Sequence, residues 1–337
     1  MSDNPPTPEE APKTEETPPI PYVDIQKQGA AESSETDDMD TATASYSCTS
    51  SITDIPFRSS TDEGTDGGTS DDVDVDQSML SDTDDDDSER DLFRSRPAIL
   101  DIRQWAEPDS DQFKVRGKNY IKDHKKIRAG ESMFKLITVD LVECEHPIMS
   151  GLCSKEDERV QLALKRGDLP PFVVAINIIV PGPPFYHLVM YYKVDDMDAI
   201  NGKAGTPFSQ LANKFFFGES DKFRDETFKL IPKIVDGNFV VRKAVGSTPA
   251  IMGNKLKQYY VRTDRFFELI LDVGSSPVAS NVVKIAKGFA KTLIVDMAFV
   301  LEGNDESVLP EKVMGSCRLK HISFKGLRQV ALPEDYE

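Results

Sequence analysis

The densest group of ionisable side chains is a basic segment at residues 114–128. It holds seven cations and one acid, Asp123, and Phe113, Tyr120 and Ile127 lie beside or among them. Such charge attracts polyanions, and each Lys or Arg near an anionic membrane surface contributes roughly 1 kcal/mol of attraction. We therefore predict that the segment binds anionic lipid, for example a phosphoinositide, through Lys114, Arg116, Lys118, Lys122, Lys125, Lys126 and Arg128.

Other partners and roles also fit these cations. Nucleic acid is a poor match, because residues 93–337 carry a net charge of only +4 and proteins that follow a phosphate backbone are usually strongly basic. We expect no nucleic acid partner. An acidic segment of a protein partner is the alternative to lipid. The remaining alternatives are a solvated face and a structural role, in which Arg116 or Lys126 holds a turn together.

A second group of cations lies on a predicted helix from Pro277 to Lys291. Ser276 can cap this helix, and Pro277 suits its first position. Its apolar residues recur at the spacing of one helical face: Val278, Val282, Ile285, Ala286, Phe289 and Leu293. Three lysines follow another face: Lys284, Lys287 and Lys291. The helix either lies on a membrane interface or packs its apolar face on a sheet and leaves its lysines solvated.

The sequence lacks the short motifs of nucleotide binding and hydrolysis, such as G-x-G-x-x-G and G-x-S-x-G. Cys144, His146 and Cys153 do not have the spacing of a structural zinc site. The acidic run Asp72–Asp76 begins like a calcium loop, but Gln77 stands where that loop needs Gly. We therefore predict no catalytic activity, no cofactor and no bound metal.

Several elements must position these residues. Three helices are predicted, at Pro207–Phe217, Asp221–Ile231 and Pro277–Lys291. Short connections such as Val180–Phe185 favour antiparallel neighbours. The predicted fold class is α+β, with a large curved, mainly antiparallel sheet of about eight strands packed on two or three helices. Runs rich in Val, Ile, Phe and Tyr predict the strands: Phe134–Glu143, Phe172–Val180, Tyr186–Val194, Phe239–Val245, Lys255–Val261, Phe266–Val273, Leu293–Leu301 and Met314–Phe324.

Charge divides the chain into an acidic tail and a folded domain. Residues 1–92 carry a net charge of −22 and a single Phe, so we predict that they are disordered. Residues 93–330 are predicted to form one domain, and residues 331–337 a short C-terminal tail. Phosphorylation beside the acidic runs would add about −1.5 to −2 charges per site and let the tail compete for the basic segment. The candidate sites are Ser70, Ser78, Ser81 and Ser88.

The expected location is cytoplasmic, peripheral at an intracellular or plasma membrane. The N-terminus has no signal core, and the most apolar run, Thr292–Leu301, is about half the length of a bilayer span. The unpaired spacing of Cys144, Cys153 and Cys317 fits a reducing compartment. We predict a protein that is neither secreted nor transmembrane.

From Trp105 onward, short segments resemble the Enhanced Disease Resistance 2 C-terminal family, in the order of that family. The resemblance also places Lys255 and Gly315 at family positions. One departure is Gly237-Asn-Phe239, where the family pattern has Gly-Pro-Trp; we expect the exchange of aromatics to keep the packing. The resembling segments are Val115–Ile127, Val139–Leu141, Phe228–Ile234, Ala244–Gly246, Asp272–Ser276, Leu293–Asp296, Leu301–Gly303 and Leu309–Glu311.

The resemblance implies a non-catalytic, lipid-linked role at intracellular membranes. In larger relatives the module follows a pleckstrin-homology domain and a START lipid-binding domain. Together with the charges, it predicts a lipid-binding module with a cavity between the sheet and the helix Pro277–Lys291, and with the basic segment as the rim of that cavity. The alternative is a protein-interaction scaffold that docks acidic partners. The motif match implies these candidate site positions: Arg116, Asn119, Tyr120, Lys126, Lys255, Asp272 and Ser276.

Overall fold

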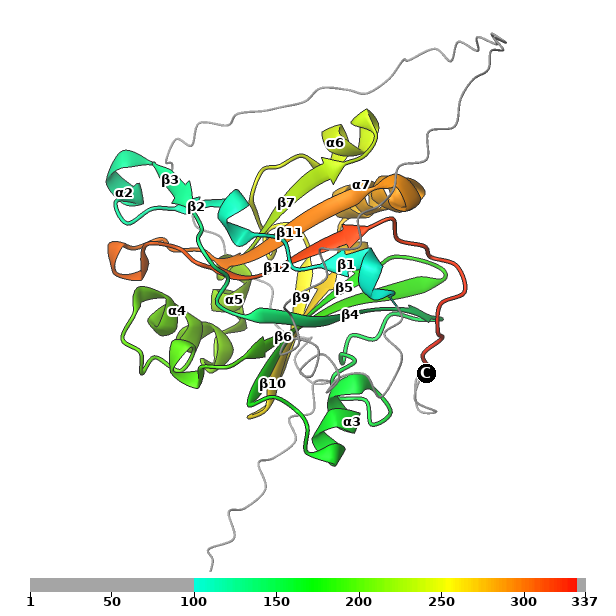
Figure 1. Ribbon diagram of the computed structural model, residues 1–337, viewed down its shortest axis with the longest axis horizontal. Helices are drawn as coiled ribbons and strands as arrows, with labels where there is room; N and C mark the ends of the chain where they lie inside the picture. The colour runs from blue at the N-terminus through cyan, green and yellow to red at the C-terminus, as the bar shows by residue number, and fades with distance from the viewer. Residues whose placement is uncertain (1–99, 332–337) are drawn as a thin grey trace, which may run out of the picture. The chain divides into compact units, whose positions relative to one another are not determined.

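The computed structural model describes residues 100–331, so the predictions for residues 1–92 and 332–337 lie outside the described residues. This range contains twelve strands in two five-stranded sheets and one two-stranded hairpin, together with six α-helices (Figure 1). The α+β class with mainly antiparallel strands is therefore confirmed. None of the helices in residues 100–331 is long and apolar enough to span a bilayer.

The first sheet has the strand order β4-β6-β5-β10-β9. Its pairs are antiparallel except β5 with β10, which run parallel. The central strands read as continuous apolar runs because both faces of this sheet are covered. The strands are β4 (Lys135–Cys144), β5 (Phe172–Val180), β6 (Phe185–Val194), β9 (Lys257–Arg262) and β10 (Phe266–Asp272).

The second sheet has the order β1-β12-β11-β7-β8 and is antiparallel throughout. Its strands are β1 (Trp105–Ala106), β7 (Phe228–Asp236), β8 (Ala250–Ile251), β11 (Ile294–Leu301) and β12 (Val313–Lys320). A separate hairpin pairs β2 (Lys114–Arg116) with β3 (Lys126–Arg128). The two sheets meet where the N–H groups of Met133 and Phe134 donate to the carbonyl oxygens of Val313 and Met314, at 2.9 and 2.7 Å.

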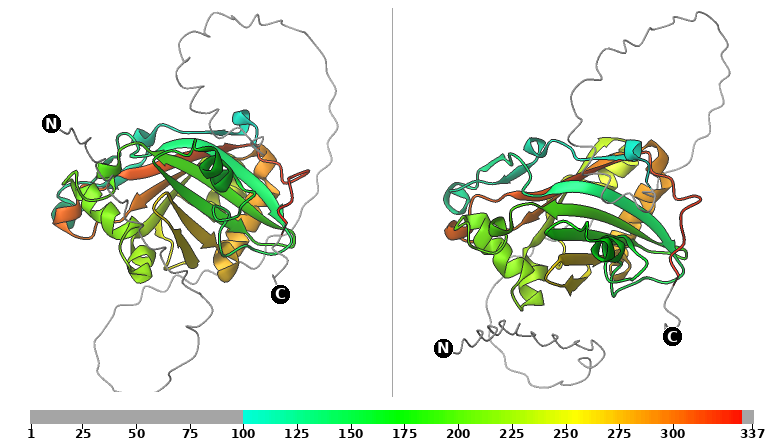
Figure 2. Two further views of the ribbon diagram at one scale, coloured as in Figure 1. Left: turned by 90° about the horizontal axis from the view of Figure 1, so that it is seen from below. Right: turned by 60° about the horizontal axis from the view of Figure 1, so that its bottom comes forward.

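The helices gather mainly at the two ends of the strands. Helices α4 and α5 lie at one end and α7 at the other, next to α6 (Figures 1 and 2). A single-turn helix, α2, lies within the hairpin. The α-helices are α2 (Tyr120–Asp123), α3 (Arg159–Arg166), α4 (Pro207–Phe216), α5 (Asp221–Thr227), α6 (Phe239–Val245) and α7 (Pro277–Gly288).

Aromatic side chains fill the space between the sheets at the α4 end. The rings of Phe215 and Phe216 in α4 lie 5.5 and 5.0 Å from the ring of Phe267 in the first sheet. Phe228 in the second sheet stacks on Phe299 with the ring centroids 5.9 Å apart. Aromatic pairs at these distances add about 0.5–1.5 kcal/mol to the burial of their area. This end of the domain is therefore a packed core.

Three predicted elements differ from the structure. The predicted curved sheet is divided into two sheets, and the predicted strand Phe239–Val245 is helix α6. Asn238 caps α6 by accepting a hydrogen bond from the N–H of Val240 at 2.8 Å. The helix predicted through Ile231 ends at Thr227, and the chain continues as β7. This strand tolerates Pro232 because β8 pairs only with Lys229 and Leu230, which leaves residue 232 without a neighbour on that side.

A buried polar network fastens the segment 148–153 to the first sheet. The carboxylate of Glu268 accepts hydrogen bonds from the N–H groups of Leu152 and Cys153 at 2.9 and 2.8 Å, and from the Asn177 amide at 2.8 Å. The His187 ring bonds to Asn177 Oδ1 through Nδ1 at 3.0 Å. Its Nε2 accepts the N–H of Ile148 at 3.1 Å, which requires a neutral ring.

The burial of His187 makes stability depend on pH. Burial lowers the pKa of this histidine from 6.5 to about 4. A depressed histidine pKa gives stability that is complete above pH 6.5 and falls as the pH drops toward 4, because only the unfolded chain takes up the proton. We expect the free energy of unfolding in urea to fall by about 2 kcal/mol between pH 7 and pH 5 from this group. His187→Gln, which can keep both hydrogen bonds, should remove that part of the dependence. An equal pH dependence in His187→Gln and in the wild type would contradict the role of His187.

Candidate functional site

A cavity of about 450 Å³ lies between α7 and the inner faces of the two sheets. Side chains of β5, β6 and β10 line it from the first sheet, and side chains of β7, β11 and β12 line it from the second. The segment from Val245 to Leu256, which connects α6 to β9, completes the wall. The cavity predicted between the sheet and this helix is therefore present in the structure. Its volume is within the range of small-molecule sites, about 300–1,000 Å³.

The lining of this cavity is almost entirely apolar. Its four polar residues are Thr248, Lys255, Ser276 and Lys287, and no acidic, histidine or cysteine side chain lines it. Within residues 100–331, no three His, Cys, Asp or Glu side chains gather as ligands for a metal ion. The lining offers dispersion contacts and two positive charges, which suits an aliphatic group with an anionic end.

Helix α7 closes the cavity without being buried itself. The Ser276 hydroxyl accepts a hydrogen bond from the N–H of Ala279 at 3.3 Å, and Pro277 occupies the first turn, as predicted. No residue of α7 is buried, although the helix packs against α6 and its Val283 packs against the main core. Its apolar residues Val282 and Ala286 line the cavity and are half-buried. Only part of the apolar face of the helix therefore lies against the protein, and the rest lies over the cavity.

The two cavity lysines lie where the lining reaches solvent. Lys255 is exposed, and Lys287 is half-buried. The Lys287 ammonium lies 4.1 Å from the ring centroid of Tyr186 and 5.3 Å from that of Phe324. Burial lowers the pKa of Lys287, because the charged form loses hydration. No acid lines the cavity, so an anionic group placed beside either lysine would be attracted by its ammonium.

The basic segment lies elsewhere, so the prediction that it forms the rim of the cavity is wrong. None of its seven cations lines the 450 Å³ cavity. Successive side chains of a strand point to opposite faces. In β7 and β11, Leu230 and Met297 face the cavity, whereas Ile231 and Ala298 pack against Val115 of the hairpin. The hairpin therefore covers the outer face of the second sheet.

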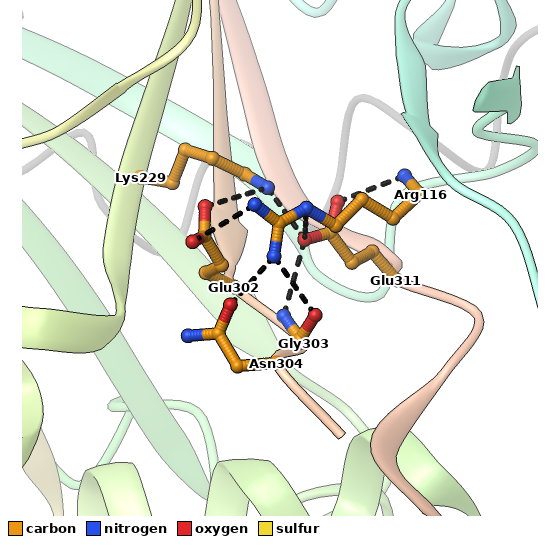
Figure 3. Close-up of polar contacts among 6 residues, drawn as sticks. All are labelled: Arg116, Lys229, Glu302, Gly303, Asn304 and Glu311. Atoms are coloured by element: carbon orange, nitrogen blue, oxygen red, sulfur yellow. Dashed lines mark hydrogen bonds and ion pairs between the residues drawn. The ribbon is translucent and has the colours of Figure 1, made fainter. Parts of the chain in front are cut away.

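An ion network fastens the hairpin to this outer face (Figure 3). Arg116 pairs with Glu302 at 3.0 Å, and Lys229 pairs with the other oxygen of Glu302 at 3.3 Å. The fully buried Glu311 carboxylate pairs with Lys229 at 2.5 Å. It also accepts the N–H groups of Arg116 and Gly303 at 2.9 and 3.1 Å. Arg116 thus has the structural role that was one of the alternatives for it.

The other cations of the basic segment are exposed. Lys122 pairs with Glu306 at 2.9 Å, and Arg128 pairs with Asp111 at 2.8 Å. Anion binding by this segment stays a prediction. A small pocket of about 170 Å³ beside the network is lined in part by Lys114, Arg116, Tyr120 and Lys126, and it shares Thr248 with the larger cavity. Four lysines form no ion pair with another described residue: Lys114, Lys118, Lys125 and Lys126.

The remaining positions implied by the resemblance fall into two groups. Lys255 and Ser276 line the cavity. Asp272 shapes the turn before α7, because its side chain accepts the N–H of Ser275 at 3.2 Å. Asn119 and Tyr120 begin α2 in the hairpin, on the outer face. The structure therefore places Lys255, Ser276 and Lys287 on the wall of one cavity that none of the cations of the basic segment lines.

Sequence comparison gives the family of the chain. A family model described as "Protein ENHANCED DISEASE RESISTANCE 2, C-terminal" matches residues 105–323. The chain belongs to this family. A curated relative from Arabidopsis thaliana, "Protein ENHANCED DISEASE RESISTANCE 2-like", is 33% identical over 220 residues, which cover 65% of this chain and 29% of the relative. The chain thus spans less than a third of that relative's length. No solved structure matches.

Family segments that lie far apart in the sequence meet in the ion network. Phe228–Ile234 contributes Lys229, Leu301–Gly303 contributes Glu302, and Leu309–Glu311 contributes Glu311. Family segments therefore supply the side chains that attach the β2–β3 hairpin to the outer face of the second sheet.

The aromatic at the point of departure from the family pattern does not lie in the core. Phe239, which stands where the family pattern has Trp, is 76% exposed in the first turn of α6. The sequence signal for α6 was weak, because a seven-residue apolar run does not distinguish a strand from a helix. As a result, α6 was missed as a neighbour of the cavity.

The ion network predicts a specific loss of stability. Glu311→Gln keeps the shape of the side chain but leaves Lys229 and Arg116 short of one negative charge. We expect the free energy of unfolding in urea to fall by about 3 kcal/mol, as for other buried pairs that lose one partner. Glu306→Gln is the control, because its pair with Lys122 is exposed and such pairs contribute little. Equal effects of the two substitutions would contradict the structural role of the network.

Proposed function

We propose that this domain binds a single-chain lipid with an anionic head. The aliphatic chain lies in the cavity between the sheets and α7, and the head lies near Lys255 and Lys287. The observation that carries the proposal is the composition of the lining, which is apolar except for two lysines, one threonine and one serine. Binding without catalysis is part of the proposal, because the lining holds no acid, histidine or cysteine that could activate Ser276 or the two lysines for acid–base or nucleophilic chemistry.

The energetics favour a long apolar chain. Each CH₂ group moved from water into the cavity contributes about 0.8 kcal/mol. The ligand would also cover half-buried apolar residues of α7, such as Val282 and Ala286. Such lipids have low solubility as monomers, so we propose that the domain loads from a membrane and associates with it peripherally.

Filling the cavity should abolish ligand binding. Ala286→Trp places a large ring into the cavity from α7, and since no residue of α7 is buried the fold should tolerate it. We expect the Kd for a fluorescent fatty acid, measured by titration of the delipidated protein, to rise by about tenfold or more, which is 1.4 kcal/mol or more. Ile285→Trp is the matched control, because Ile285 is half-buried on the same helix and does not line the cavity.

Absence of saturable binding in the wild type, or equal binding by the two variants, would contradict the proposal.

Removing the charge at the cavity should change the preference for the head group. Lys287→Met keeps the aliphatic stem beside Tyr186 and Phe324 and removes the ammonium. We expect about tenfold weaker binding of a fatty acid, the effect of losing one charge-assisted hydrogen bond, and unchanged binding of the fatty alcohol of equal length. Lys284→Met is the control, since Lys284 is exposed on α7 and does not line the cavity. A parallel loss for acid and alcohol in Lys287→Met would rule out a role of its charge in recognising the head group.

A further inference from the structure

The helices that border the cavity carry strongly exposed apolar side chains. Phe239 and Val240 in the first turn of α6 are 76% and 50% exposed, and Val278 in the first turn of α7 is 75% exposed. The two helices pack against each other, and both contribute to the cavity wall, α6 through Val245. Apolar area left in water in this way is hydrophobic free energy that a partner would gain by covering it. This exposed surface adjoins the cavity.

The exposed phenylalanine is held by a defined turn and not by a loose loop. The Arg242 guanidinium donates to the carbonyl oxygens of Gly237, Ile234 and Val235 at 3.1, 3.2 and 3.2 Å. Gly237 has φ 154°, and a Cβ there would come within 2.9 Å of Leu293 Cδ1. These contacts fix the start of α6 and direct Phe239 outward.

The two chain segments that contain α6 and α7 are positively charged. Residues 235–257 and 272–292 together contain seven cations and two acids, Asp236 and Asp272. Among the described residues, Arg242 alone of the seven forms an ion pair, with Asp236 at 3.8 Å. Lys243 lies four residues after Phe239, so both side chains lie on one face of α6. The cations are Arg242, Lys243, Lys255, Lys257, Lys284, Lys287 and Lys291.

We propose that α6 and α7 form the surface by which the domain docks on an anionic bilayer to exchange its lipid. We call this the α6–α7 surface: Phe239, Val240, Lys243, Val278, Lys284 and Lys291. The apolar residues enter the boundary between head groups and acyl chains, and the lysines contact anionic head groups. Docking in this orientation brings the cavity to the bilayer. The inference rests on the proposed function and assigns the docking to a surface other than the basic segment of the hairpin.

The first test compares two variants of equal charge by flotation of the full chain. Vesicles of phosphatidylcholine with phosphatidylserine are compared with vesicles of phosphatidylcholine alone. Lys243→Gln/Lys284→Gln/Lys291→Gln should bind anionic vesicles at least about tenfold more weakly, because three cations that would contact anionic head groups are removed. The matched control removes the same three charges from the hairpin and should float as the wild type does: Lys118→Gln/Lys125→Gln/Lys126→Gln.

The second test addresses the apolar contact. Phe239→Ser/Val240→Ser should weaken partition into anionic vesicles by about tenfold or more, because the two apolar side chains would no longer be removed from water. In Phe239→Trp, the added indole should shift its emission to shorter wavelength on vesicle addition, whereas the protein's one other tryptophan, Trp105, is buried. Unchanged emission would overturn the proposal.

Separate readouts distinguish docking from ligand binding. Phe239 and Val240 do not line the cavity, so Phe239→Ser/Val240→Ser should bind the fluorescent fatty acid with wild-type affinity while it fails to float. Fatty acid binding absent in the wild type, with flotation still dependent on Phe239, would refute the proposed function and leave the docking surface standing. Any one of three results would overturn the docking proposal: equal loss in both charge variants, loss in the hairpin variant alone, or wild-type partition of Phe239→Ser/Val240→Ser. The third result would indicate that the α6–α7 surface binds a protein partner instead of a bilayer.

Discussion

Strands β7 and β11 bury side chains on both of their faces, and this double burial determines where the other elements can lie. Because side chains alternate along a strand, Leu230 and Met297 face the cavity while Ile231 and Ala298 face the β2–β3 hairpin. The ion network around Glu311 holds the hairpin on that outer face. A basic segment fixed there is separated from the cavity by the sheet itself. The charges that line the cavity come instead from α7 and from the chain between β8 and β9.

Helix α7 has clear local start signals and little buried area. Ser276 caps it and Pro277 begins it, yet none of its residues is buried. An apolar helix face above a cavity leaves part of the hydrophobic free energy unrealised until a ligand fills the space. Elements with little buried area open locally at low free-energy cost. A helix of this kind would let a lipid chain pass without disturbing the aromatic core at the α4 end of the strands.

Local patterns in the sequence predicted local structure well, and long-range partners poorly. The apolar run Phe172–Val180 became β5 with the predicted bounds, and the cap and first turn of α7 followed from two residues. The strand β7 was missed because Pro232 argues against a strand unless one edge is open. Arg116 is bonded to Glu311, 195 positions away, so charge density located the basic segment without showing which cations were already paired. The family segments contained Glu302 and Glu311, but no spacing within them showed that they meet.

Positive charge occurs on the hairpin and on the α6–α7 surface, and charge alone does not distinguish the two. Coulomb attraction between exposed groups is screened beyond about 8 Å at physiological ionic strength, and exposed lysines on either surface experience it equally. The surfaces differ in apolar exposure, because Phe239 is 76% exposed whereas Ile121 and Ile127 of the hairpin region are 42% and 46% exposed. Burial of apolar area adds attraction that salt does not screen. The α6–α7 surface combines both forces beside the cavity, so an acyl chain that moves between bilayer and cavity there would avoid water.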